Sequence, residues 1–120
     1  MASSKKTEKQ NMEFMDLYKS VDNSIKKILG TDKGITEYIN ILELKAQGSK
    51  STPEMKQDLK MLKHLRWVRN KLAHEVDYGT QILEAGDGEW LENFQKRIRK
   101  GKLPVRPTLG DRIRRLFSRR

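Results

Sequence analysis

Residues 53–75 have the sequence PEMKQDLKMLKHLRWVRNKLAHE, the longest stretch of the chain that follows one helical pattern. Its main apolar stripe recurs every three or four residues, the spacing of one face of an α-helix. The stripe consists of Met55, Leu59, Leu62, Leu65 and Leu72. Pro53 suits the first turn of a helix, because the amide hydrogen that proline lacks has no helical partner there. This stretch therefore predicts a long amphipathic helix.

Three further segments have apolar residues at helical spacing, and a glycine follows within three residues of the end of each. They are residues 11–29, 34–47 and 87–98. Residues 76–88 contain three glycines and scattered acids, which predict a loop whose Asp87 caps the last helix. No strand alternation or internal repeat is present. The sequence predicts an all-α fold, an up-and-down four-helix bundle over residues 11–101 that follows a flexible N-terminus over residues 1–10.

Length and composition narrow the class of protein. A chain of 120 residues has room for one domain and can bury a core without disulfides. Cysteine is absent, which excludes a disulfide framework, a thiolate zinc site and a cysteine nucleophile. The N-terminus lacks the apolar core of a secretory signal, and no stretch approaches the roughly 20 apolar residues of a membrane span. We therefore expect a soluble, cytoplasmic protein.

The net charge of +10 is concentrated at the C-terminus, because residues 96–120 contain eleven Lys or Arg and one acid. Residues 102–120 form a basic tail in which apolar residues recur at helical spacing, so it is a short amphipathic helix or becomes one on binding. We favour an arm that adds RNA affinity. An anionic membrane surface, a docked partner and a plain solvated tail are the alternatives. The candidate nucleic-acid-binding residues are Lys63, Arg66, Arg112, Arg114, Arg115, Arg119 and Arg120.

Arg66 and Arg69 are the only arginines in the first 95 residues, where lysine occurs thirteen times. At about 100° per residue, Arg69 falls inside the apolar arc of its helix. A charge buried there without a partner would be strongly destabilising, so Arg69 requires an anion. That anion is either a bound phosphate or a carboxylate from another helix, such as Glu37 or Glu43.

A second stripe of the same helix contains Lys63, Trp67, Asn70 and His74. A tryptophan among polar side chains predicts a face covered by another chain or by another element of the fold, and Trp67 is the candidate dimer contact. A histidine can exchange protons near neutral pH, and an arginine can neutralise phosphate. With an orienting amide, these groups suffice in principle for attack of a 2′-hydroxyl on the adjacent phosphodiester without a metal.

Arg69 and His74 are about 140° apart on a regular helix, so convergence requires a bend, long reach or a second copy of the site. A twofold dimer supplies that copy.

The run from Arg69 through Asn70 to His74, late in a long helix, resembles the signature of the HEPN superfamily. The resemblance covers about residues 11–101 and implies a HEPN-type helical bundle whose homodimer is a ribonuclease. It implies that Arg69 and His74 are catalytic and that Asn70 supports them. Many family members are toxins or antiviral effectors encoded beside a nucleotidyltransferase antitoxin. That antitoxin modifies a tyrosine two residues after the histidine, where this chain has Val76.

Simpler interpretations stand beside these. Arg69 taken alone would fit a structural ion pair. His74 would fit a histidine that interacts favourably with the dipole at a helix end. Trp67 would fit a packing role rather than base stacking. His64 is expected to be exposed. Neither a metal nor a cofactor is predicted, because Glu75 and Asp77 lack a second well-spaced histidine. The rival to a ribonuclease is a non-catalytic helical module that binds RNA or a partner protein.

Overall fold

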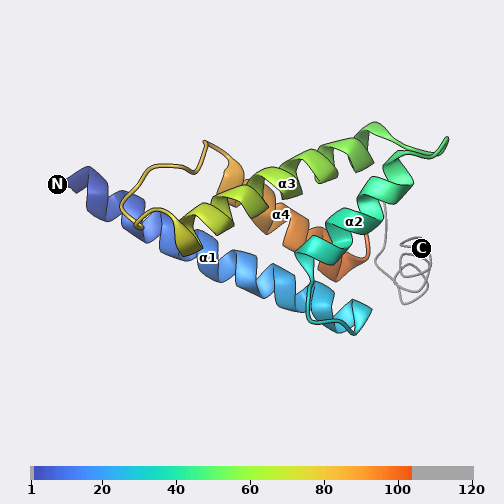
Figure 1. The fold of residues 1–120 in the computed structure, drawn as a ribbon, viewed down its shortest axis with the longest axis horizontal. Helices are drawn as coiled ribbons and strands as arrows, with labels where there is room; N and C mark the ends of the chain where they lie inside the picture. The colour runs from blue at the N-terminus through green and yellow to red at the C-terminus, as the bar shows by residue number, and fades with distance from the viewer. Residues whose placement is uncertain (1, 104–120) are drawn as a thin grey trace.

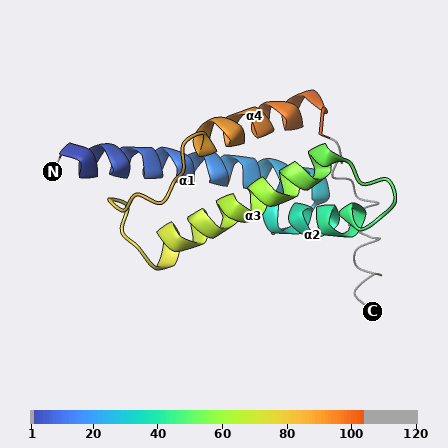
Figure 2. The same ribbon diagram turned by 90° about the horizontal axis from the view of Figure 1, so that it is seen from above.

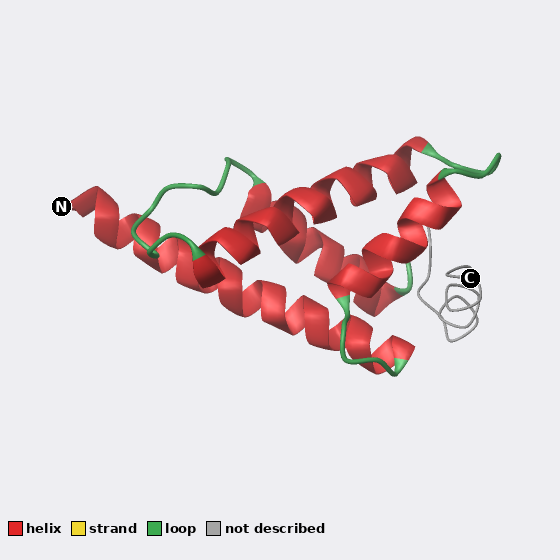
Figure 3. Ribbon diagram, in the orientation of Figure 1, coloured by secondary structure: helices red, strands yellow, loops and turns green. Residues whose placement is uncertain are grey.

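The computed structural model describes residues 2–103, with side chains from residue 5 onward, and this part of the chain contains α-helices and no strand (Figures 1 and 3). The helices are α1 (Ala2–Leu29), α2 (Ile35–Ala46), α3 (Pro53–His74) and α4 (Asp87–Lys100). The prediction of an all-α fold with four helices is confirmed. None of the helices in the described residues is long and apolar enough to cross a membrane.

One hydrophobic core joins all four helices. In Figures 1 and 2, α1, α3 and α4 run in alternating directions, while the shorter α2 is inclined to α1 and forms a hairpin with α3. Most of the apolar residues predicted to face the core are buried. The fully buried side chains are Val21, Ile25, Leu29, Ile35, Tyr38, Ile39, Leu42, Leu62, Leu65, Val68, Leu91 and Phe94. The apolar stripes seen in the sequence therefore face one another in the fold.

Helix α1 begins at Ala2, so residues 2–10, which the sequence predicts as an N-terminus outside the bundle, are helical. This segment has no apolar periodicity, but it is rich in lysine, glutamate and glutamine, which favour helix. The Asn11 side-chain amide donates to the carbonyl oxygens of Tyr78 at 2.7 Å and Thr80 at 2.8 Å. These long-range hydrogen bonds tie α1 to the loop after α3.

Asp22 joins the end of α1 to the start of α2. Its Oδ1 accepts a hydrogen bond from the backbone amide of Ile35 at 2.8 Å, which satisfies a free N–H at the start of α2. Its other carboxylate oxygen lies 3.2 Å from Lys26 Nζ. A Cβ at Gly34 would lie 2.1 Å from the Asp22 carbonyl oxygen, so the close approach of the two helices requires glycine.

Helix α3 begins as the sequence predicts, with Pro53 in its first turn. The structure adds a cap, because the Thr52 hydroxyl accepts a hydrogen bond from the Met55 amide. Helix α4 ends at Gly101, whose φ of 66° is the left-handed conformation that favours glycine. Leu103 is buried, so the core extends two residues beyond the predicted boundary at residue 101.

The predicted tail residues Arg112, Arg114, Arg115, Arg119 and Arg120 lie outside the described residues.

A buried ion pair connects α3 to α4. The Arg97 guanidinium donates from Nη2 to Asp58 Oδ1 at 2.8 Å and from Nη1 to Asp58 Oδ2 at 3.1 Å. Asp58 is 1% exposed, and Arg97 also reaches the exposed Glu54 at 3.2 Å. The guanidinium lies 5.3 Å from the centre of the Phe94 ring, so its flat face is also covered. This pair fixes the position of α4 against α3.

Asp87 and His64 hold the loop after α3. Asp87 is the first residue of α4 and Gly86 is the N-cap, one residue earlier than predicted. The Asp87 carboxylate accepts from the Glu84 amide at 2.9 Å and lies 2.8 Å from His64 Nε2. The prediction that His64 is exposed is wrong, because its side chain is three-quarters buried against this carboxylate.

Candidate functional site

A groove of about 770 Å³ lies between the C-terminal halves of α1 and α3, beside the start of α2. Its wall includes Arg66, Arg69 and Asn70, three of the residues singled out in the sequence. His74, Trp67 and Lys63 do not line it. The fold therefore gathers the arginines and the amide on one side of α3 and leaves the histidine outside.

Arg69 is partly buried, and its side chain is held by its neighbour. Its Nη1 donates to Asn70 Oδ1 at 3.1 Å, which leaves the other guanidinium N–H groups available. Among residues 5–103, no carboxylate lies within 4.0 Å of the Arg69 or Arg66 guanidinium; the ion pairs involve other residues. Glu43, one predicted partner, pairs with Lys63 at 3.4 Å instead. The structural ion pair considered for Arg69 is therefore absent from the described part of the chain.

The groove carries more positive than negative side chains. Five lysines or arginines and three aspartates line it. The cations are Lys19, Lys26, Lys33, Arg66 and Arg69, and the carboxylates are Asp16, Asp22 and Asp32. The Asp22 carboxylate already pairs with Lys26 and accepts a hydrogen bond from the Ile35 amide. A concave surface with this balance concentrates anions.

Tyr18 also lines the groove, and the sequence indicated only that it belongs to the core. Burial and the nearby Asp22 raise the pKa of the Tyr18 hydroxyl to about 12, while Arg69 and Arg66 oppose the rise. The hydroxyl therefore stays neutral and protonated across the physiological pH range.

The outer face of α3 carries Trp67 and His74. Trp67 is 50% exposed, stacks on the His64 ring at 6.4 Å and has Lys71 Nζ 5.6 Å from its ring centre. His74 is the last residue of α3, is exposed, and has no hydrogen-bonding partner among the described residues. Lys71 and Glu75 beside it form their own pair at 2.9 Å. In a single chain this face is open to water.

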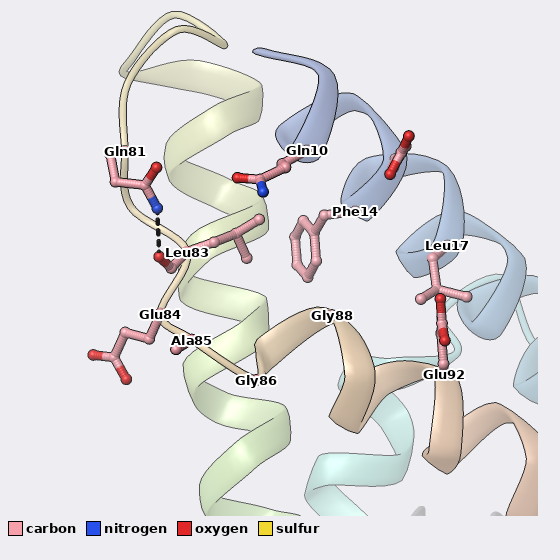
Figure 4. A pocket seen from close by; sticks show the side chains of 11 residues that line it. Gln10, Phe14, Leu17, Gln81, Leu83, Glu84, Ala85, Gly86, Gly88 and Glu92 are labelled. Atoms are coloured by element: carbon pink, nitrogen blue, oxygen red, sulfur yellow. Dashed lines mark hydrogen bonds between the residues drawn. The ribbon is translucent and has the colours of Figure 1, made fainter. Parts of the chain in front are cut away.

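A second cavity, of about 510 Å³, lies between α1, the loop before α4 and the first turn of α4 (Figure 4). The Phe14 ring faces into it, and the Gln81 side chain spans its edge by donating to the Leu83 carbonyl at 2.8 Å. Its charged lining residues are Glu13, Glu84 and Glu92, with no lysine or arginine among the described residues. A phosphate would be repelled there, so an anion site belongs in the groove between α1 and α3.

His64, Glu84 and Asp87 place three potential metal ligands within 4.8 Å of one another. The sequence indicated no such cluster, because the two acids are twenty or more positions from the histidine and meet it only through the loop. Asp87 Oδ2 already accepts a hydrogen bond from the Glu84 amide and is hydrogen-bonded to His64, and the Glu84 side chain is 77% exposed. The hydrogen bonds that hold this loop account for the cluster.

Residues 12–111 match a family of unknown function, DUF6548, and the chain belongs to that family. No curated protein and no solved structure matches the chain.

Proposed function

We propose that the protein is a metal-independent endoribonuclease of HEPN type that acts on single-stranded or loop RNA as a homodimer. The observation that supports this most is the state of Arg69. Its guanidinium is partly buried at a positively charged groove, is held by Asn70 at 3.1 Å, and has no carboxylate partner among the described residues. A partly buried arginine without a carboxylate partner is well suited to bind a phosphate.

In the proposed reaction, the ribose 2′-oxygen attacks the adjacent phosphorus and its proton passes to a histidine. The bond to the 5′-oxygen breaks, and that oxygen takes up a proton, leaving a 2′,3′-cyclic phosphate and a 5′-hydroxyl. His74 is the proposed proton-transfer group, Arg69 stabilises the negative charge on the non-bridging phosphate oxygens, and Asn70 orients Arg69. No step of this reaction requires a metal.

The separation of Arg69 and His74 is the reason for proposing a dimer. Within one chain Arg69 lies at the groove and His74 lies outside it, so one copy does not bring the two groups together. A twofold dimer through the outer face of α3 would cover Trp67 and bring His74 of one copy toward the groove of the other. The half-exposed tryptophan supports this face as the contact.

The resemblance to HEPN proteins also favours a toxin or antiviral role in the cytoplasm. In HEPN proteins the nucleotidyltransferase antitoxin modifies a tyrosine two residues after the histidine. Here Val76 occupies that position and the nearest tyrosine is Tyr78, so control of this kind would require modification of a different tyrosine. The basic tail is proposed to add RNA affinity.

A non-catalytic RNA-binding module is the second candidate, and the position of His74 outside the groove favours it. Cleavage of a mixed RNA pool in EDTA distinguishes the two. If the protein is a ribonuclease, the wild type should cleave the pool and His74→Ala should not. Glu75→Gln, a matched change at the exposed neighbouring residue, should cleave as the wild type does. A binding module should leave the pool intact, and His74→Ala should bind RNA as tightly as wild type.

A further inference from the structure

Tyr18 has a buried ring and an unpaired hydroxyl. The residue is 7% exposed, and its ring packs 5.9 Å from that of Phe14 in the core. The hydroxyl has no hydrogen-bond partner among the described residues. The Tyr18 hydroxyl is not fully buried. Among the described residues, Ser51 Oγ is the side-chain polar atom that is both fully buried and without a partner. Since Tyr18 lines the groove, its hydroxyl opens into that space.

A buried tyrosine usually finds a partner for its hydroxyl, because an unmade hydrogen bond in a desolvated place is costly. Arg66 and Arg69, which have no carboxylate partner among the described residues, line the same groove and oppose the rise in the pKa of the Tyr18 hydroxyl, while Asp22, also in the lining, adds to it. The neutral hydroxyl can donate a hydrogen bond, and no oxygen among the described residues accepts one from it. A bound anion with several oxygens would accept hydrogen bonds from this hydroxyl and from the two arginines.

We infer that the Tyr18 hydroxyl, Arg66 and Arg69 form a phosphate-binding subsite in the groove between α1 and α3, in which Tyr18 donates a hydrogen bond to a non-bridging oxygen of a phosphodiester. A phosphate carries several oxygens, so a single group can accept hydrogen bonds from a hydroxyl and from two guanidinium groups at once. The inference deepens the proposed ribonuclease function by assigning a substrate-binding residue on α1. It depends on phosphate binding and not on cleavage.

The subsite is tested by NMR titration of the full ¹⁵N-labelled chain with a 2′-O-methyl RNA trimer, which cannot undergo 2′-hydroxyl attack, and with inorganic phosphate. Wild type should show saturable shifts at Tyr18 and Arg69. Tyr18→Phe removes one hydrogen bond to a charged group and should weaken binding of the trimer about tenfold, equivalent to roughly 1.4 kcal/mol. Arg69→Gln should weaken it further.

Tyr38→Phe is the matched control, because it removes a hydroxyl from a buried tyrosine that does not line the groove. It should bind the trimer as wild type does. Thermal unfolding of each variant separates loss of binding from loss of fold.

Cleavage of unmodified RNA, measured in parallel, separates this inference from the proposed function. Weaker binding by Tyr18→Phe supports the subsite whether or not wild type cleaves RNA. If wild type cleaves and Tyr18→Phe binds and cleaves equally well, the ribonuclease stands and the Tyr18 assignment is overturned. Absence of any shift in the groove with either ligand would also overturn it.

Discussion

Replacing Asp58 by alanine should destabilise the fold more than any other single removal of a charge among the described residues. Asp58 is 1% exposed and accepts two hydrogen bonds from Arg97. Its loss leaves a guanidinium that is three-quarters buried without its main partner. Removing one member of a buried ion pair costs about 3–5 kcal/mol, and the nearby Glu54 places this case near the lower end. The expected decrease is about 3 kcal/mol, which corresponds to roughly 10–20 °C in Tm for a domain of this size.

The assay is urea unfolding followed by circular dichroism, with thermal unfolding as a second measurement. Glu54→Ala is the control, because this exposed partner of the same guanidinium should contribute less than about 1 kcal/mol. The double variant Asp58→Leu with Arg97→Met should recover most of the loss, since it removes both charges and leaves apolar groups. A cost below about 1 kcal/mol for Asp58→Ala, or a double variant less stable than the single, would refute this account of how α4 is fixed.

Three other changes test the fold. Gly34→Ala should lower the free energy of unfolding in urea by about 2 kcal/mol, because the added Cβ would collide with the Asp22 backbone. A variant as stable as wild type would contradict the close approach of α2 to Asp22. Asn11→Ala should cost about 2 kcal/mol and speed amide exchange at residues 78–80, whereas unchanged exchange would mean that the loop is held by other contacts. Tyr18 has a folded pKa raised from 10 to about 12, so its contribution is complete below pH 10 and lost as pH rises toward 12. The stability of wild type should therefore fall relative to Tyr18→Phe over that window by up to roughly 2.7 kcal/mol, and parallel pH profiles would exclude the raised pKa.

The sequence predicted the helices well because apolar periodicity reports directly on burial. The stripe on α3, Pro53 in its first turn and the glycine after α4 are local signals, and each was confirmed. The start of α1 was missed because residues 2–10 have no buried stripe. Their helix is supported by helix-favouring residues and by hydrogen bonds from Asn11 to a loop 67 positions away, which no local pattern indicates.

The candidate site was predicted in part. The helical wheel placed Arg69 inside the apolar arc of α3 and about 140° from His74. In the structure Arg69 is partly buried at the groove, and His74 does not line the groove. The pairing of Asp58 with Arg97 and of His64 with Asp87 could not be predicted, because it depends on how α4 packs against α3. Tyr18 was read only as a core residue, since periodicity reports that its ring is buried but not where its hydroxyl points.

The central claim is that Arg69 and His74 act together across a homodimer, and mixing two inactive variants tests it most directly. Arg69→Gln and His74→Ala are each expected to lack RNA cleavage in EDTA. After the two are unfolded together and refolded, half of the dimers should contain both variants, and each of these should regain one complete site. The account predicts recovery of about a quarter of wild-type activity. Stable mixed dimers that cleave no RNA, or cleavage by either variant alone, would contradict the composite site.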